Sequence, residues 1–302
     1  MHNLEVNVMN YYWQLKALVT DLTNNKDNFR NYRKDPKASD LIIISLKLAS
    51  EAMGINSENN LYHRLEADYS RLRNMLPDRS NFNRRCRSLT AVIDVCAEKM
   101  VEAFSLSSDE YIIDSSPLPI CRNARIPRIK IMRDDPEMFP ARGWSACDKG
   151  YFYGYKLHLL TCSNGLIYSY YITPGNIHDS DLTMDLCTNT SDAEIYGDKG
   201  YINKLKQLDL FENFNTSLIT PSRKNSKQPN RKWNNKVAVK RKRIETVFSQ
   251  FTDQFGIKRN FAKTFEGFYS RIVSKIASMT FLHYINFLNG NSIGQIKNLS
   301  VN

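Results

Sequence analysis

The sequence predicts an α/β fold, in which an all-α N-terminal region precedes one mixed sheet flanked by helices. Residues 1 to about 106 carry apolar side chains at helical spacing throughout. From residue 107 the pattern changes to short apolar runs, in the order strand, hairpin, helix, strand, helix, strand. We therefore expect two domains, at 1–106 and 107–290, followed by a short tail at 291–302.

Composition limits the classes of function. The 302 residues carry a net charge of +11, which indicates a polyanionic partner, either nucleic acid or an acidic membrane surface. The longest apolar-rich stretch, ASMTFLHYINFL, is too short to span a bilayer, so nucleic acid is favoured and no membrane partner is expected. No signal peptide is visible, and the six cysteines form no CxxC pair, which predicts reduced thiols in the cytoplasm and no zinc site.

The N-terminal region is predicted to hold a series of helices. The most apolar stretch, SDLIIISLKLASEAMG, has Ser39 or Asp40 as its N-cap and Gly54 as its stop. Residues 77–104 carry an apolar stripe at helical period and are predicted to form one helix. The stripe consists of Phe82, Cys86, Leu89, Ile93, Cys96, Met100 and Phe104.

A cluster of arginines lies at the start of this predicted helix, off the apolar stripe. Arg84, Arg85 and Arg87 are candidates for DNA binding, since such a helix can enter a DNA groove in a helix-turn-helix arrangement. The other interpretation is a solvated basic face on a packing helix. Both interpretations stay open at this point, because helix-turn-helix units have no sharp signature in this sequence.

The later elements follow from their local patterns. EYIIDSS is a short apolar run ending in an acid, and GYKLHLLTC and LIYSYYITPG form a hairpin across the turn SNG. HDSDLTMDLC predicts a capped helix, and AEIYGDKGY and SLITPS are further strands with a helix between them. CRNARIPRIKIMRDDPEMFPARGWSACDKG is predicted to be a long surface loop. Amphipathic or apolar helices are expected at 236–255 and at about 267–288.

Three acids stand out by their positions in these elements. Asp198 follows the AEIY strand directly before a helix, which is where open α/β sheets place catalytic groups. Asp114 ends the first strand, and Glu245 lies at the edge of the buried face of the 236–255 helix. If the two strands are neighbours, Asp114 and Asp198 lie side by side, and the packed helix can bring Glu245 to the same point.

Three carboxylates at one point repel each other unless cations lie between them. Oxygen ligands suit Mg²⁺ or Mn²⁺, and two such ions can activate the attacking oxygen and stabilise the leaving oxygen of a phosphodiester. Asp148, Asp179 and Asp181 compete with these three acids for the role. Of the competitors, Asp179 is better explained as a helix cap.

The chain resembles bacterial insertion-sequence transposases of the DDE superfamily. The matching pieces are YIIDSSPLPIC, YFYGYKLHLL, ITPGNIHDSD, YGDKGYI and RKRIETVFSQF, in that order. The resemblance implies an RNase H-like fold, with Asp114, Asp198 and Glu245 as catalytic residues that bind two Mg²⁺ or Mn²⁺ ions. It also implies cleavage of double-stranded DNA at transposon ends and strand transfer into target DNA through a 3′-hydroxyl. By the same resemblance, the protein is expected to act on DNA as a homodimer and to be associated with the nucleoid.

The family's signature around the glutamate places a Tyr seven positions before it, an Arg four before it and a Lys seven after it. Arg241 fits the second position, whereas Ala238 and Thr252 do not fit the other two. Arg241 is expected to contact a phosphate near the scissile bond. The basic run that leads into this helix, residues 223–243, is expected to follow the DNA backbone. Its first part contributes Lys224, Lys227, Arg231 and Lys232.

Two further motifs have alternative interpretations. Lys156 and His158 share a strand face, which either approaches DNA near the metals or is the exposed face of an ordinary hairpin. His178 either contacts the scissile phosphate or caps the next helix, and a structural role with some contact to the residues around the metals is preferred. For the whole chain, the alternatives are an RNase H-like nuclease without strand transfer and a catalytically inactive relative that only binds DNA.

Overall fold

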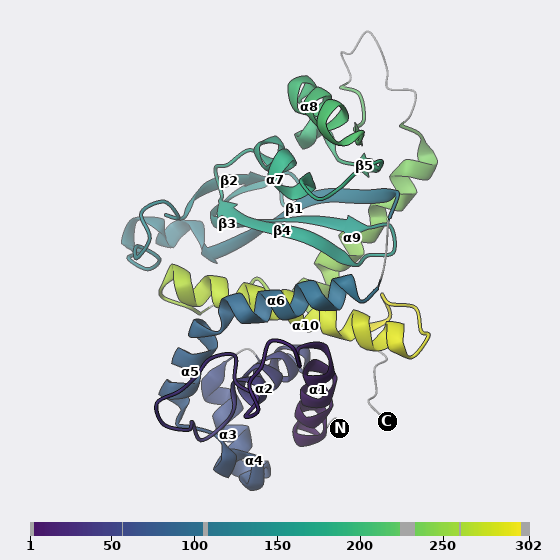
Figure 1. Ribbon diagram of the computed structural model, residues 1–302. Coiled ribbons are helices and arrows are strands. Elements are labelled where there is room, and N and C mark those ends of the chain that lie inside the picture. The colour runs from purple at the N-terminus through teal and green to yellow at the C-terminus, as the bar shows by residue number, and fades with distance from the viewer. Residues whose placement is uncertain (1–2, 56, 105–107, 224–232, 260, 297–302) are drawn as a thin grey trace. The chain divides into compact units, whose positions relative to one another are not determined.

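The structure is a computed structural model that describes residues 3–55, 57–104, 108–223, 233–259 and 261–296 (Figure 1). It divides into two compact units, which are described separately. Unit 1 comprises Met1–Ser105, Phe251–Ala262 and Glu266–Asn302. Unit 2 comprises Leu106–Gln250 and Lys263–Phe265.

Unit 1 is built from helices. They are α1 (Leu4–Leu18), α2 (Asp40–Ala52), α3 (Glu58–Asp68), α4 (Ser70–Met75), α5 (Arg79–Ser88), α6 (Thr90–Glu102) and nearly all of α10 (Phe265–Leu288). The predicted ends of α2 are confirmed. The Ser39 hydroxyl accepts a hydrogen bond from the Ile42 backbone amide, and Gly54 has a positive φ of 68° just after the last turn.

The prediction of a single helix at 77–104 is wrong in one respect, because the structure forms two helices there, α5 and α6. All seven residues of the apolar stripe are buried, as their spacing indicates. The break lies at Leu89, which ends α5 and begins α6 with φ −100° and ψ 6°. Beside it, the Thr90 hydroxyl donates to the backbone carbonyls of Cys86 and Arg87. Such side-chain hydrogen bonds compete with the helical ladder, which explains the interruption.

The C-terminal helix α10 packs with the N-terminal helices of unit 1. Tyr11 stacks on Phe281 with ring centroids 3.7 Å apart, and the Ser278 hydroxyl donates to the Leu48 carbonyl at 2.8 Å. The compact units therefore group α10 with residues 1–105, whereas the sequence places it within 107–290. The functional division near residue 106 stays a prediction.

Unit 2 contains a six-stranded mixed sheet in the order β2-β3-β1-β5-β6, with β4 also paired to β3. The strands are β1 (Glu110–Cys121), β2 (Ala141–Ser145), β3 (Gly150–Cys162), β4 (Ile167–Pro174), β5 (Glu194–Tyr196) and β6 (Ser217–Ile219). The predicted hairpin is confirmed as β3 and β4. β1 is antiparallel to β3 but parallel to β5, and β5 is parallel to β6.

Two predictions about the first strand and the following loop are corrected. β1 does not end at Asp114 but continues to Cys121, because its second half pairs with the long strand β3 up to Tyr153. The stretch predicted as a surface loop contains the 3₁₀-helix η1 (Asn123–Arg128) and the strand β2, which pairs with β3. Both errors arise because pairing partners supply the hydrogen bonds that local sequence patterns do not reveal.

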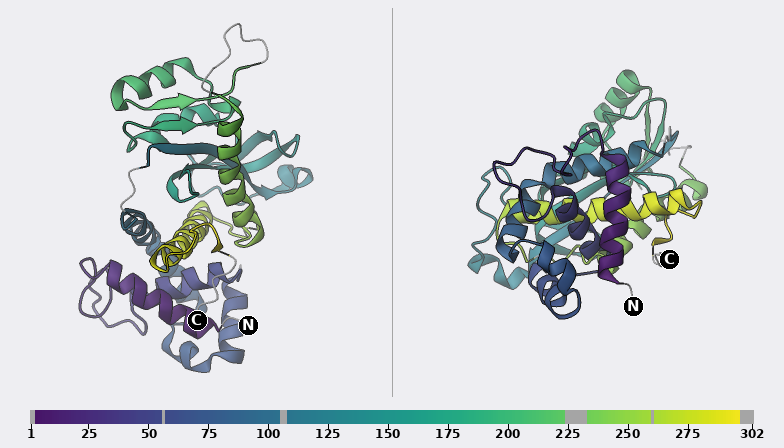
Figure 2. Two further views of the ribbon diagram at one scale, coloured as in Figure 1. Left: turned by 90° about the vertical axis from the view of Figure 1, so that its right-hand side faces the viewer. Right: turned by 60° about the horizontal axis from the view of Figure 1, so that its bottom comes forward.

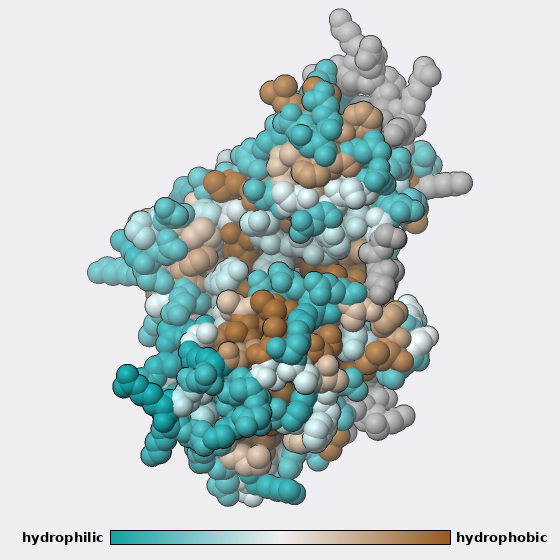
Figure 3. All heavy atoms as spheres, viewed as in Figure 1, coloured by the Kyte–Doolittle hydropathy of each residue, from teal (hydrophilic) through white to brown (hydrophobic). Residues whose placement is uncertain are grey.

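Short and long helices accompany this sheet. They are the 3₁₀-helices η2 (Asp179–Leu182) and η3 (Lys199–Tyr201) and the helices α7 (Thr183–Cys187), α8 (Lys204–Phe214) and α9 (Asn235–Asp253). α7 packs against β3 and β4, and α9 runs alongside the sheet (Figure 2). α8 exposes Leu205, Leu208 and Phe211, and hydrophobic residues appear at the surface near it (Figure 3). Among the described residues, no helix is long and apolar enough to cross a membrane.

Candidate active site

The parallel pairing of β1 and β5 brings Asp114 and Asp198 together. Ile112 pairs with Tyr196, and each aspartate lies two residues beyond this pair in its own chain segment. This confirms that the two strands are neighbours, as the sequence predicts. Asp198 is the N-cap of η3, where its Oδ1 accepts a hydrogen bond from the Gly200 amide at 2.7 Å. The turn therefore holds the Asp198 carboxylate at the carboxyl end of β5.

A third acid, Asp179, lies beside these two. A Cβ placed on Gly200 would lie 2.9 Å from Asp198 Oδ1 and 3.1 Å from Asp179 Oδ2, so both carboxylates border the same small space. Asp179 Oδ1 accepts hydrogen bonds from the Ser115 hydroxyl and the Lys156 ammonium, each at 2.9 Å. Asp179 thus links β1, β3 and η2 around the two strand-end acids.

The prediction that Asp179 caps a helix is wrong, because the residue before it has this role. His178 is the N-cap of η2, and its Nδ1 accepts from the Ser180 amide at 3.3 Å. Capping was one of the two alternatives for His178, and it is confirmed. The Asp179 carboxylate is free of this task and points to Ser115 and Lys156 instead.

The electrostatics of the cluster centre on Asp114. Burial raises the pKa of Asp114 to about 7; Arg241 opposes this shift, and Asp198 and Asp179 add to it. The Arg241 guanidinium donates to Asp114 Oδ2 at 2.9 Å. This partner does not offset the combined effect of burial and of the two neighbouring carboxylates on the pKa of Asp114. The cluster therefore favours additional positive charge.

The acids also surround a buried tyrosine. Tyr201 is fully buried, and burial together with Asp179, Asp114 and Asp198 keeps its pKa well above the ordinary value. Its hydroxyl has no hydrogen-bond partner among the described residues. A neutral phenol can donate a hydrogen bond, so Tyr201 offers a donor within the field of the three carboxylates.

Lys156 and His158 point from β3 towards Asp179. Lys156 Nζ also donates to the Ile177 carbonyl at 2.9 Å, and its side chain is only 13% exposed. His158 is fully buried, its Nε2 lies 2.8 Å from the Thr173 hydroxyl, and burial lowers its pKa to about 4. The alternative of an exposed hairpin face is therefore wrong. A direct contact of Lys156 with DNA stays a prediction.

The predicted third acid, Glu245, is placed differently from the aspartates. It lies in α9 one turn after Arg241, and its side chain is exposed. Among the described residues, Glu245 does not form a group of three acids with Asp114 and Asp198 that could hold a metal ion. Arg241 is the residue of α9 that reaches the cluster. The structure therefore brings together two of the three predicted catalytic acids, together with Arg241.

The other predicted DNA-binding residues belong to other segments of the chain than this cluster. Arg84, Arg85 and Arg87 all belong to α5 of unit 1. Arg85 forms an ion pair with Asp40, and Arg87 forms one with Glu266. The remaining predicted contacts, Lys224, Lys227, Arg231 and Lys232, lie outside the described residues.

The donor atoms of the cluster are suited to a hard divalent cation. Carboxylate oxygens are the ligands that Mg²⁺ and Mn²⁺ prefer. Burial is the main cause of the raised pKa of Asp114, and the carboxylates of Asp198 and Asp179 add to it. Within the described ranges, however, no group of three His, Cys, Asp or Glu side chains is arranged to hold a metal ion. Lys156 and Arg241 engage Asp179 and Asp114 in this arrangement. The residue types of the cluster are thus those that a hard divalent cation prefers.

The raised pKa of Asp114 has a measurable effect on stability without divalent cations. Between the ordinary value of 3.8 and about 7, the unfolded chain releases this proton while the folded protein keeps it. We expect the free energy of unfolding of the wild type, relative to Asp114→Asn, to fall as pH rises through this window and to level off above it. Urea unfolding in chelator across the window measures this difference. Parallel pH profiles for the two proteins would contradict the assignment.

Asp179 belongs to this cluster, although its sequence context predicts a helix cap. The directions of the strands give an indication of its true position. The predicted hairpin makes β4 run antiparallel to β3, and β1 is antiparallel to β3 as well. β4 is therefore parallel to β1 and β5, so the carboxyl ends of β4 and β5 meet at one edge. An acid shortly after β4 would then be expected near Asp198.

Comparison with known families gives one match. A family model described as the transposase DDE domain matches residues 105–261, slightly more than half of the 302 residues. The matched range contains Asp114, Asp179, Asp198, Arg241 and Glu245. No curated protein matches the chain.

Proposed function

The chain belongs to the DDE transposases, and on this premise we propose that it binds the ends of its insertion sequence and catalyses metal-dependent DNA cleavage and strand transfer. Members of this family are nucleic-acid-processing enzymes. The observation that carries the proposal is the parallel register of β1 and β5, which sets Asp114 and Asp198 side by side. The net charge of +11 supports a DNA substrate.

The sheet of unit 2 supports an RNase H-like catalytic domain. Antiparallel strands β1, β3 and β4 are followed by β5 and β6, which extend the sheet in parallel from β1, with α7 and α8 in the connections. In this proposal, residues 1–106 form the helical DNA-binding domain and residues 107–290 the catalytic domain, with 291–302 as a tail. α10 then belongs to the catalytic domain in function, although it packs within unit 1.

We assign the chemistry to the cluster of acids. Asp114 and Asp198 hold the cation, and Glu245 completes the set when DNA and metal are bound. When bound, Mg²⁺ or Mn²⁺ would polarise the phosphodiester and favour deprotonation of the attacking oxygen. Lys156 and Ser115 fix the Asp179 carboxylate beside Asp198, so Asp179 is a positioning residue or a further ligand. Water and then a DNA 3′-hydroxyl are the successive nucleophiles.

The basic residues near this site are assigned to the DNA backbone. Arg241 lies on α9 beside Asp114, so a phosphate at the metal site would be within the reach of this helix. The run at 223–243 leads directly into α9 and carries cations that can follow the strand further out. Two DNA ends must be processed together in transposition, which supports a homodimer as the active form.

The proposal predicts metal-dependent cleavage of a specific DNA. The substrate is a duplex that carries the inverted repeats flanking the gene, and the full chain is the enzyme. We expect nicking at the repeat ends and joined strand-transfer products with Mg²⁺ or Mn²⁺, and none in chelator. Ca²⁺ should support DNA binding without cleavage, because its looser coordination positions the nucleophile poorly.

The products of the same assay separate the alternatives. Cleavage without joined products would indicate a nuclease rather than a transposase. DNA binding without cleavage in any metal would indicate a catalytically inactive relative. Full cleavage in chelator would reject the metal-dependent mechanism.

A further inference from the structure

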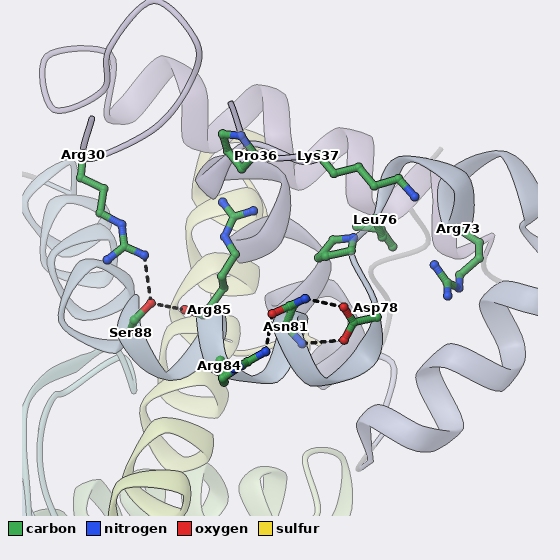
Figure 4. Close-up of a pocket in the computed structure, with 11 residues that line it drawn as sticks. Arg30, Pro36, Lys37, Arg73, Leu76, Asp78, Asn81, Arg84, Arg85 and Ser88 are labelled. Carbon is green, nitrogen blue, oxygen red and sulfur yellow. Dashed lines mark hydrogen bonds between the residues drawn. The ribbon is translucent and has the colours of Figure 1, made fainter. Parts of the chain in front are cut away.

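Unit 1 contains a basic hollow of about 760 Å³ (Figure 4). It is formed by the segment between α1 and α2, the end of α4, the connection from α4 to α5, and α5 as far as its last residue, Ser88. We call it the arginine hollow. The charged residues that line it are Arg30, Lys37, Arg73, Arg84, Arg85 and Asp78.

The cations of the arginine hollow outnumber its acids. The one lining acid, Asp78, caps α5, where it accepts from the Asn81 amide at 2.9 Å. Arg85 is neutralised by Asp40 and Arg73 by Glu66. This leaves an excess of positive charge on three other cations of the lining.

These three cations are Arg30, Lys37 and Arg84. Arg30 donates to the hydroxyls of Tyr32 and Ser88, at 2.9 and 3.3 Å, and Arg84 donates to the Asn81 side chain at 2.5 Å. Within the part of the chain that the structure describes, none of the three forms an ion pair with an acid. Their charges are therefore available to an anion that enters the hollow.

The walls of the hollow are fixed by polar contacts, which centre on the buried Asp40 side chain. The Arg85 guanidinium donates to Asp40 Oδ1 at 2.5 Å and to the Ala38 carbonyl at 2.6 Å, and the Asp40 side chain is fully buried. Ser88 receives the Arg30 hydrogen bond and donates to the Arg85 carbonyl at 3.0 Å. These contacts tie the segment before α2 to α5. The backbone that carries Arg30, Lys37 and Arg84 is thus positioned before a ligand binds, which lowers the entropic cost of binding.

The lining also indicates what kind of anion fits. Arginine guanidinium groups present planar sets of donors that match phosphate oxygens. The volume exceeds that of a single phosphate group. The apolar lining residues are Pro36, Leu76 and Pro77, and no aromatic ring is among the lining residues to stack on a base. The surface over α5 and the segment before α2 is mostly hydrophilic (Figure 3). These features favour a sugar–phosphate backbone over an exposed base.

We propose that the arginine hollow binds the backbone of duplex DNA, with Arg30, Lys37 and Arg84 contacting phosphates. Arg85 has a structural role instead, because its ion pair with Asp40 fixes the wall of the hollow. This inference rests on the proposed function in that it names the DNA-contacting surface of unit 1. It also resolves the predicted arginine cluster into a contact residue, Arg84, and a positioning residue, Arg85.

The test compares two triple variants of the full chain that lose the same charge. The first is Arg30→Ala with Lys37→Ala and Arg84→Ala, within the hollow. The matched control removes one lysine and two arginines that are exposed and lie outside the hollow lining: Lys26→Ala, Arg64→Ala and Arg71→Ala. Affinity for duplex DNA is measured against salt concentration without divalent metal, and thermal unfolding checks that both variants fold.

Each lost phosphate contact should make the plot of log affinity against log salt shallower by about 0.9. We therefore expect the hollow variant to lose about 2.7 in slope, for any DNA sequence, and the control variant to keep the wild-type slope. Equal slopes for wild type and hollow variant would overturn the proposal. The proposal would also be overturned if the hollow binds only free anions. In that case inorganic phosphate or dATP would raise the unfolding temperature of the wild type but not of the hollow variant, and the salt slopes for DNA would be the same in both proteins.

This test is independent of the transposase chemistry. A change of slope in the hollow variant, together with an absence of cleavage in every metal, would support the DNA-binding surface and contradict the proposed function. Metal-dependent cleavage together with an unchanged slope in the hollow variant would support the proposed function and contradict the DNA-binding surface.

Discussion

The Asp198→Asn protein should fold, bind DNA and lose cleavage by several orders of magnitude. Asparagine removes the charge that a divalent cation requires from this position. Its side-chain oxygen can still accept the hydrogen bond of the Gly200 amide, which Asp198 accepts at 2.7 Å, so the turn after β5 should persist. Because Asp198 is one cause of the raised pKa of Asp114, the substitution also reduces repulsion. Thermal stability should be equal or slightly higher.

Single-turnover cleavage, DNA affinity and thermal unfolding measure these three properties. The matched control is Asp181→Asn, since Asp181 is largely exposed and pairs with Lys206. It should cleave at nearly the wild-type rate. A folded Asp198→Asn protein with near-normal cleavage would remove Asp198 from the active site. The same comparison applies to Asp114→Asn and Glu245→Gln.

The second large effect is expected on stability, at a buried ion network in unit 1. Glu51 is 1% exposed and lies between two buried lysines: Lys47 at 2.7 Å and Lys275 at 2.5 Å. Burial alone would raise the pKa of Glu51, but the two lysines outweigh it and lower this pKa to about 2. Glu51→Ala would leave both lysines buried without their shared partner. Removing one member of a buried ion pair costs about 3–5 kcal/mol.

Such a loss approaches the whole stability of many domains, which is about 5–15 kcal/mol. Chemical unfolding followed by a probe in unit 1 measures it. The control is Asp35→Ala, because Asp35 pairs with Lys26 at an exposed position. Surface pairs contribute at most about 1 kcal/mol, so this variant should unfold almost as the wild type does. Similar losses in the two variants would show that the buried network does not stabilise unit 1.

The candidate site was partly predictable because Asp114 and Asp198 each follow a short apolar run that is recognisable as a strand, although β1 continues past Asp114 to Cys121. The two acids lie side by side if these strands are neighbours, and the register of β1 and β5 shows that they are. Asp179 was assigned to capping, because a local pattern cannot distinguish a cap from a carboxylate held by a distant lysine. Its partner Lys156 lies 23 residues away and reaches it through the pairing of β3 with β4.

The arginines of α5 illustrate the same limit. Their sequence pattern is a run of cations off an apolar stripe, which is compatible with a DNA-binding face or with a solvated one. Both Arg84 and Arg85 line the basic hollow, but only the fold shows that Arg85 is held by Asp40, 45 residues away, while Arg84 is exposed. Neighbours in sequence therefore have different environments.

The helical N-terminal pattern, the change to strands after residue 107 and the hairpin of β3 and β4 could be predicted from the sequence alone. These features depend on periodicity, caps and turns, which are encoded within a few residues. The break at Leu89 is local, but the apolar stripe continues across it, so periodicity does not reveal it. The extension of β1 to Cys121, the position of Asp179 and the packing of α10 in unit 1 required the tertiary structure, because each depends on partners elsewhere in the chain. Glu51 and Lys275, for example, lie 224 residues apart, and no local pattern encodes their pairing.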